Sequence, residues 1–248
     1  MTDPQQIGGS SVLHLAYGLY AWMLFLVLGA AAVPVLLLTP SLAHRRAIVR
    51  ALAGSVLKLI GMRLRIRGLQ RLQIPCVVVA NHASYLDGVV LAAALPPSFS
   101  FVIKREMSSV PIAGTLLRRI GAEFVERQNH RRRGRDARRL IREAEHGKAL
   151  VFFPEGTFSE EVGLLRFHIG AFAAAARADM AVFPVAIRGT RSCLPPGRIL
   201  PRPGSIDVEV LAQLPHAADD PVALREAARA ALLTQLGEPD LAGPKLDT

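Results

Sequence analysis

The stretch CVVVANHASYLD, residues 76–87, decides the fold of this chain. Residues 76–80 are apolar throughout, which is typical of a strand buried on both faces in a sheet. The polar residues that follow lead into a helix expected at about 86–95. A buried strand that passes through a short loop into a helix is the repeating unit of α/β folds. Open sheets of this kind hold their sites in the loops at the carboxyl ends of the strands.

Strand and helix candidates alternate on both sides of this unit. Strands are predicted at 63–67, 98–104, 122–126, 150–153, 182–188 and 206–211, the first of them at a sheet edge. Helices are predicted at about 107–120, 129–146, 166–178 and 219–237. This alternation predicts an α/β domain with helices on both faces of the sheet.

The N-terminal segment is unusually apolar. Residues 4–43 contain no Asp, Glu, Lys or Arg, and 13–38 are almost wholly apolar. About 20 such residues cross a bilayer as a helix, although Pro34 should bend or break it late. A retained membrane helix, spanning or re-entrant, is the main interpretation. A cleaved signal peptide would need a basic start that is missing here, and a buried core helix is the third alternative.

The charges that flank this segment predict its orientation. Arg45, Arg46, Arg50 and Lys58 follow it, whereas only Asp3 precedes it. The positive-inside rule then puts the rest of the chain on the cytoplasmic side of the inner membrane. Residues 44–62 form a basic amphipathic pattern, which predicts a second helix that either lies in the membrane interface or packs on the domain.

We therefore expect three parts. Residues 1–62 form membrane-anchoring helices, 63–237 form the α/β domain, and 238–248 form a flexible tail.

Composition restricts the class of protein further. The 248 residues are 51% hydrophobic and carry a net charge of +10. These values exclude a disordered chain and imply an anionic partner. The two cysteines, Cys76 and Cys193, form no CxxC pair, so a disulfide framework or a cysteine zinc site is not expected.

The arginine run at 127–142 is the densest cluster of charge. It contains eight arginines and one acid, Asp136. It is either a solvated helix face or a surface that attracts anionic lipid. The aromatic side chains that interleave with basic ones in single-strand nucleic-acid binders are missing, so no nucleic-acid partner is expected.

His82 and Asp87 are the first candidates for chemistry. They lie five residues apart in the loop that follows the buried strand. A carboxylate folded back onto one imidazole nitrogen fixes the tautomer and makes the other nitrogen a general base. The alternative is that Asp87 caps the helix and that His82 has no role.

Two further segments end predicted strands. Phe153-Pro154-Glu155-Gly156-Thr157 makes a sharp turn after the strand at 150–153, and Glu155 there is either a site residue or a solvated turn residue. Gly121-Ala122-Glu123-Phe124-Val125-Glu126-Arg127 ends in an arginine, which suits a phosphate but is also common on surfaces.

The order of these motifs resembles the glycerolipid acyltransferase family. The chain has NHxxxxD at 81–87, Gly-x-x-Phe-x-x-Arg at 121–127, Phe-Pro-Glu-Gly-Thr at 153–157 and Val-x-Pro-Val at 182–185. The likeness covers about residues 60–210 and is strongest to bacterial 1-acylglycerol-3-phosphate acyltransferases. It implies a mixed sheet like that of glycerol-3-phosphate acyltransferase.

The resemblance also implies a reaction and a set of roles. An acyl group passes from acyl-CoA or acyl carrier protein to a lysophospholipid hydroxyl at an anionic membrane surface. No metal or cofactor is required, because a thioester is already activated. His82 is the implied base, Asp87 its orienting partner and Lys104 the oxyanion stabiliser. The implied substrate-binding residues are Asn81, Arg127, Glu155, Gly156 and Thr157.

The chain departs from the family pattern near the implied acceptor site. Phe158 replaces a basic residue, and His168-Ile169 replaces a Lys-Lys pair. The acceptor could therefore be another lysolipid, such as a lyso-ornithine lipid. A thioesterase and a non-enzymatic basic membrane-tethered protein are the competing functions. The thioesterase would have no use for an acceptor arginine, and the binding protein would not need His82, Asp87 and Glu155 together.

Overall fold

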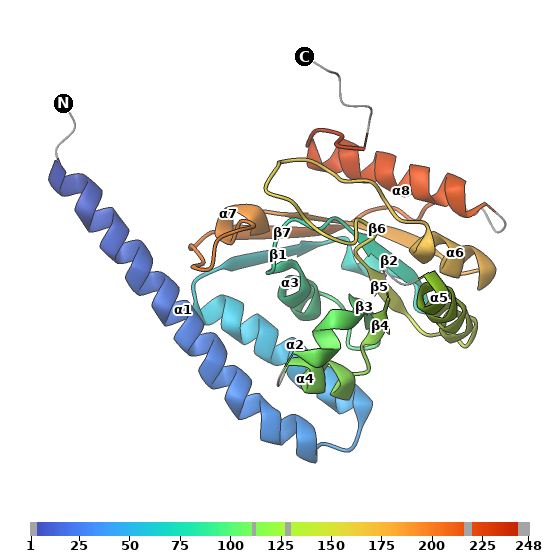
Figure 1. The fold of residues 1–248 in the computed structure, drawn as a ribbon, viewed down its shortest axis with the longest axis horizontal. Coiled ribbons are helices and arrows are strands. Elements are labelled where there is room, and N and C mark those ends of the chain that lie inside the picture. The colour runs from blue at the N-terminus through green and yellow to red at the C-terminus, as the bar shows by residue number, and fades with distance from the viewer. Residues whose placement is uncertain (1–3, 111–112, 127–129, 216–219, 243–248) are drawn as a thin grey trace.

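A computed structural model describes residues 4–110, 113–126, 130–215 and 220–242. Within these ranges, one sheet contains seven strands in the order β1-β7-β6-β2-β5-β3-β4 (Figure 1). The β6–β7 pair is antiparallel and the other neighbouring pairs are parallel. The sheet is therefore mixed, as the resemblance implied.

The strands are β1 (Arg63–Arg67), β2 (Val77–Ala80), β3 (Ser100–Lys104), β4 (Glu123–Val125), β5 (Leu150–Phe152), β6 (Val182–Arg188) and β7 (Ser205–Val210). The α-helices are α1 (Pro4–Leu38), α2 (Leu42–Leu59), α3 (Asp87–Ala94), α4 (Ala113–Arg119), α5 (His130–Glu145), α6 (Gly170–Arg177), α7 (Thr190–Cys193) and α8 (Pro221–Leu236). Two 3₁₀ helices are η1 (Leu69–Arg71) and η2 (Arg105–Ser109).

The strand predictions are confirmed to within two residues at each end. The apolar run at 76–80 forms β2, which is buried along its length between β6 and β5. The alternating segment at 63–67 forms β1 at the edge of the sheet. Burial on both faces requires a continuous apolar run, whereas an edge strand tolerates charged side chains, so the two patterns separated correctly.

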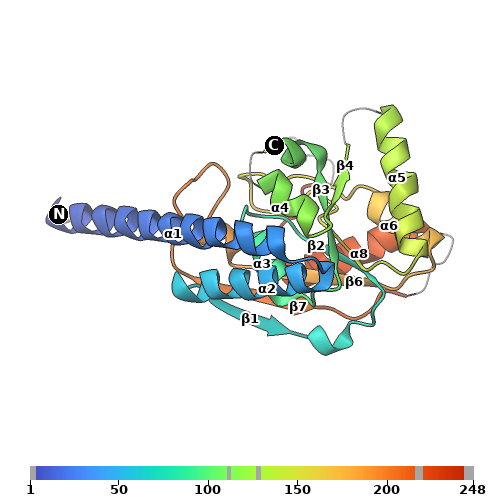
Figure 2. The same ribbon diagram turned by 90° about the horizontal axis from the view of Figure 1, so that it is seen from below.

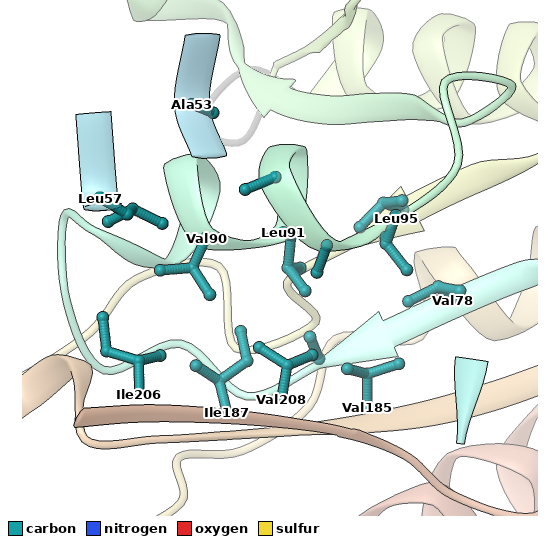
Figure 3. Packing of buried hydrophobic residues seen from close by; sticks show 14 of the residues in the cluster. Ala53, Leu57, Val78, Val90, Leu91, Leu95, Val185, Ile187, Ile206 and Val208 are labelled. Atoms are coloured by element: carbon teal, nitrogen blue, oxygen red, sulfur yellow. The ribbon is translucent and has the colours of Figure 1, made fainter. Parts of the chain in front are cut away.

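Helices cover the two faces of the sheet in two separate layers. On one face, α1, α2 and α3 pack over inward-facing side chains such as Val78 and Val185 (Figures 2 and 3). On the other face, α5, α6 and α8 pack over Val77 and Val79. Because neighbouring residues of β2 point to opposite faces, this one strand contributes to both cores. The predicted architecture, with helices on both faces, is confirmed.

The N-terminal helix α1 is a long apolar rod that runs alongside the domain. Its segment Val12–Leu38 has a mean hydropathy of 2.5 and is long enough to cross a membrane, and 17% of its most apolar part is buried. The helix continues through Pro34 without a break. The Tyr17 hydroxyl donates to the carbonyl of Ile60 at 2.8 Å, and Trp22 Nε1 donates to the carbonyl of Ile199 at 2.8 Å.

Helix α2 belongs to the folded core. Ala53, Val56 and Leu57 are buried, and Ala53 and Leu57 face Val90 and Leu91 of α3 (Figure 3). Of the two alternatives for the second helix, the structure therefore shows packing on the domain. Packing continues across the expected boundary at residue 62.

Two expected elements differ in extent. The predicted helix at 107–120 divides into η2 and α4, because Val110 is extended, with φ −69° and ψ 122°. The residue that follows Val110 in the sequence is a proline, which disfavours the helical conformation at the preceding position. Part of the segment expected as a tail, 238–248, makes hydrogen bonds to the domain. The backbone of Leu164 is hydrogen-bonded to Pro239 and Leu241, so residues 238–242 pack on the domain.

Candidate active site

The loop between β2 and α3 brings His82 and Asp87 together. His82 Nδ1 lies 2.8 Å from Asp87 Oδ2, and the Asp87 side chain is fully buried. The same carboxylate oxygen accepts the backbone N–H groups of Ala83 at 2.7 Å and Ser84 at 2.9 Å. Asp87 also begins α3, where the helix dipole favours a negative charge. These contacts hold the carboxylate in a fixed position.

The His82 ring lies between two aromatic side chains. Phe153 stacks on it with ring centroids 4.3 Å apart, and Phe158 approaches edge-on at 4.5 Å. Asp87 at Nδ1 selects the tautomer with the proton on Nδ1, which leaves Nε2 as the basic nitrogen. The His82 side chain is 19% exposed. The ring is therefore held in one orientation, but a ligand can still reach it.

Glu155 supports the loop from beneath. Its carboxylate accepts the backbone N–H of His82 at 2.6 Å and that of Leu165 at 2.9 Å. Only 4% of the residue is exposed, and this burial raises its pKa to about 7. Glu155 thus holds His82 in place, and both of its oxygens are engaged. The family resemblance implies that Glu155 binds the substrate, and that role stays a prediction.

Asn81 is buried and bonded to the neighbouring strand β6. It is 2% exposed, and its side-chain amide exchanges two hydrogen bonds with the backbone of Ile187 in β6, at 2.9 and 2.7 Å. This arrangement closes the end of the sheet beside the loop. Both amide groups are engaged with the backbone of Ile187, and the implied role of Asn81 in substrate binding stays a prediction.

Three of the remaining predicted residues lie in the turn after β5 and at the end of β3. Gly156 adopts φ +75°, the left-handed conformation that a glycine tolerates, and the neighbouring Thr157 side chain is exposed. Lys104 ends β3 at the same edge of the sheet, with an exposed side chain. Within the described residues it makes no hydrogen bond to His82 or Asp87. Arg127 lies outside the described residues.

An apolar cavity of about 460 Å³ opens beside the loop. Helices α1 to α4 and strand β3 form its walls, and Tyr85 and Gly88 of the site loop line it together with Phe25, Ala32 and Leu36 of α1. No sequence pattern pointed to this cavity, because its walls come from elements far apart in the chain. The cavity extends from the apolar helix α1 to the loop that carries His82.

Metal binding finds no support in the described part of the chain. No group of three or more His, Cys, Asp or Glu side chains there could hold a metal ion. The site consists of a histidine–carboxylate pair, a supporting glutamate and an apolar cavity.

Comparison with known proteins identifies the family. A family model described as Acyltransferase matches residues 63–188, about half of the chain. The fold resembles that of the 1-acyl-sn-glycerophosphate acyltransferase PlsC from Thermotoga maritima, with a TM-score of 0.75, 20% identity, and coverage of 92% of this chain and 96% of that one. The chain belongs to the acyltransferase family.

Curated relatives include enzymes with two kinds of acceptor. The chain is 33% identical to the chloroplastic 1-acyl-sn-glycerol-3-phosphate acyltransferase LPAT1 of Arabidopsis thaliana, over 54% of this chain and 38% of the relative. It is also 33% identical to the lyso-ornithine lipid O-acyltransferase of Pseudomonas aeruginosa, over 66% of this chain and 69% of the relative. The chain spans about two fifths to half of the plant and algal relatives that it matches.

Proposed function

We propose that this protein transfers a fatty acyl group from a thioester donor to the free hydroxyl of a lysophospholipid. The observation that carries the proposal is the His82–Asp87 pair, 2.8 Å apart at the end of β2, beside an apolar cavity. A thioesterase would use the same pair on water. The relatives with acceptor-specific names and the family match favour transfer to a lipid.

The reaction divides naturally among these residues. His82 Nε2 takes the proton of the acceptor hydroxyl as its oxygen attacks the thioester carbonyl. The Asp87 side chain at Nδ1 orients the ring and stabilises the imidazolium that forms. The tetrahedral intermediate then collapses, the carbon–sulfur bond breaks, and the imidazolium returns the proton to the leaving thiolate. Lys104, at the same sheet edge, is the proposed donor to the oxyanion.

The apolar cavity is the proposed site of the acyl chain. Its volume of about 460 Å³ is within the range of ligand pockets, and Tyr85 and Gly88 link it to the catalytic loop. Each methylene that leaves water there contributes about 0.8 kcal/mol to binding. The acyl chain would thus lie against α1, where membrane lipids are within reach.

The proposed location is the cytoplasmic face of the inner membrane, with an anionic lipid surface as partner. The flanking arginines support this orientation. Helix α1 contacts the domain from Tyr17 to the cavity-lining Leu36, a length over which a spanning helix would be surrounded by lipid. We therefore favour a helix that lies along the membrane rather than across it.

1-Acylglycerol-3-phosphate is the proposed acceptor, with phosphatidate as the product. In this proposal Arg127 binds its phosphate, and Gly156 and Thr157 also contact the acceptor. One observation favours a lyso-ornithine lipid as the second candidate. Phe158 packs on His82 and on Tyr85, with its ring centroid 4.8 Å from that of Tyr85, where the family pattern has a cation. An apolar ring there suits an acceptor without a phosphate at that point.

Product analysis by mass spectrometry tests the proposal. The purified protein receives one acyl donor and a mixture of lysophosphatidate, lyso-ornithine lipid and other lysolipids. A diacyl product that disappears in the His82→Ala variant supports acyl transfer. Release of free fatty acid with no lipid product would instead identify a thioesterase. Phe158→Arg should shift the preference toward lysophosphatidate if a missing cation sets the acceptor.

A further inference from the structure

A second concave site lies between η2 and α5, outside the machinery described above. It is a recess of about 480 Å³ lined by Arg105, Arg135, Asp136, Arg139 and Arg142. Asp136 in the lining and Glu123 behind it each pair with one of the four guanidinium groups, so two unpaired positive charges remain around a space large enough for a nucleotide. No role in the His82 site accounts for this concentration of charge.

The arginines of the recess fall into two pairs. Arg105 donates to both oxygens of Asp136, at 3.0 and 2.8 Å, and Arg139 pairs with Glu123. Arg105 and Arg139 are thus held by carboxylates and form the wall of the recess. Arg135 and Arg142 are exposed and have no acceptor among the described residues. Guanidinium forks that bind nothing in the protein and face a recess are suited to phosphate groups.

The position of α5 argues against a lipid partner for these arginines. Helix α5 packs on the sheet through Leu140 and Ala144, in the layer opposite α1 (Figures 1 and 2). A membrane that contacts the exposed face of α1 would not at the same time reach the outer side of α5. The arginine run, which the sequence alone connected with anionic lipid, thus favours a partner that approaches from the aqueous side.

The recess is also within reach of the catalytic pair. Strands β2, β5 and β3 are parallel neighbours, so their carboxyl ends share one edge of the sheet. Two strand spacings, about 10 Å in total, separate the end of β2 from that of β3. Arg105 follows β3 directly, and in the same short helix η2 Met107 lines the apolar cavity. A ligand that crosses η2 would touch both sites.

We propose that the recess binds the phosphates of a nucleotide-bearing thioester, the adenosine 3′,5′-bisphosphate end of acyl-CoA. This inference rests on the proposed function, in which a thioester is the donor. The two phosphate groups of the bisphosphate match the two unpartnered guanidinium groups, and the arm between the nucleotide and the sulfur is long enough to pass η2 to His82. The acyl chain then enters the cavity on the other face, so the carrier and the chain occupy opposite sides of the sheet.

Matched substitutions on α5 test the proposal. Arg135→Gln/Arg142→Gln removes the two unpartnered arginines of the recess, whereas Arg138→Gln removes an exposed, unpartnered arginine of the same helix that does not line it. Glutamine preserves helix propensity, so all variants should fold alike by circular dichroism. The full-length protein in neutral detergent is titrated with adenosine 3′,5′-bisphosphate by calorimetry. In parallel, kcat and KM are measured with acyl-CoA and with acyl carrier protein.

The double variant should raise the KM for acyl-CoA and the Kd for the bisphosphate by tenfold or more, which corresponds to the loss of about one charge-assisted contact. The kcat should change little. The Arg138 variant should stay within about twofold. Equal losses in both variants, or no binding of the bisphosphate by the wild type, would overturn the proposal. So would a loss confined to the kinetics with acyl carrier protein. Calorimetry needs no turnover, so a wild type that binds the bisphosphate but acylates no lysolipid would refute the proposed function alone.

Discussion

Arginine serves opposite purposes on the two faces of this sheet. On the α1–α2–α3 face, Arg46 donates to the carbonyls of Ile120, at 2.8 Å, and Ser98, at 3.0 Å, and also contacts Ser100. On the α5 face, Arg135 and Arg138 extend into solvent with no partner among the described residues. The comparison teaches that a count of basic residues does not identify a partner. Arg46 on one face holds the backbone together, whereas the exposed, unpartnered arginines of α5 on the other face remain available to a ligand.

The largest effect, on kcat, should come from the catalytic histidine, whose loop lies at the end of β2 between the two helical layers. His82→Ala removes the general base and should lower kcat by 100-fold or more, while the free energy of unfolding changes little. Asp87→Asn should be comparably damaging, because an amide favours the wrong imidazole tautomer. Steady-state kinetics and urea unfolding measure the two quantities. More than a tenth of wild-type activity in His82→Ala would exclude this catalytic role.

Glu155 provides the next test, through stability. Burial raises its pKa from the ordinary 4.5 to about 7, so the folded state holds a proton that the unfolded chain loses first. The stability from this group is complete below pH 4.5 and is lost as the pH rises through about 7, by roughly 3 kcal/mol at most.

Glu155→Gln cannot lose a proton. The difference in unfolding free energy between the variant and the wild type should therefore move in favour of the variant between pH 5 and pH 8. Denaturant midpoints at the two pH values measure it. A difference that does not change with pH would mean that Glu155 is ionised throughout this range.

The third substitution sharpens the contrast between the arginines directly. Arg46→Lys keeps the charge but loses most of the hydrogen bonds to backbone carbonyls, and should lower the free energy of unfolding by about 2 kcal/mol. Arg138→Lys on α5 should change it by less than about 0.5 kcal/mol. Urea unfolding of both variants gives the comparison, and equal effects would remove the distinction between the two faces.

The smallest effect concerns the length of the acyl chain. Gly29 of α1 lines the cavity, and a Cβ atom added there would meet no atom within 4 Å. Gly29→Leu should exclude one or two methylenes from the cavity, at about 0.8 kcal/mol each, and lower kcat/KM for long chains about tenfold relative to shorter ones. Gly54→Leu on α2, equally open but outside the cavity lining, is the control. Unchanged chain preference in Gly29→Leu would place the acyl chain elsewhere.

The sequence predicted the local features of this molecule well. The apolar run of β2, the polar loop after it and the His82–Asp87 spacing all depend on residues close together in the chain. Roles that depend on distant partners were not predictable. Asn81 binds Ile187, 106 positions away, and Glu155 binds the backbone of His82, 73 positions away. Both residues resembled substrate ligands because a strand-end position does not reveal which way a side chain turns.

The layers posed the same difficulty on a larger scale. Strand alternation predicted helices on both faces but not which helix covers which face. The cavity and the arginine recess follow from that assignment, since η2 gives Met107 to one and Arg105 to the other. Only the topology of the sheet shows that the apolar cavity and the arginine recess lie on opposite sides of it.

Photocrosslinking tests most directly the claim that the acyl chain binds on the α1–α2–α3 face. An acyl-CoA with a diazirine at the end of its chain is bound to the His82→Ala protein, which should not turn it over, and adducts are mapped by peptide mass spectrometry. We expect adducts at cavity residues such as Leu28, Leu36 and Leu117. Adducts concentrated on α6 or α8, with none in the cavity, would contradict this account of the site.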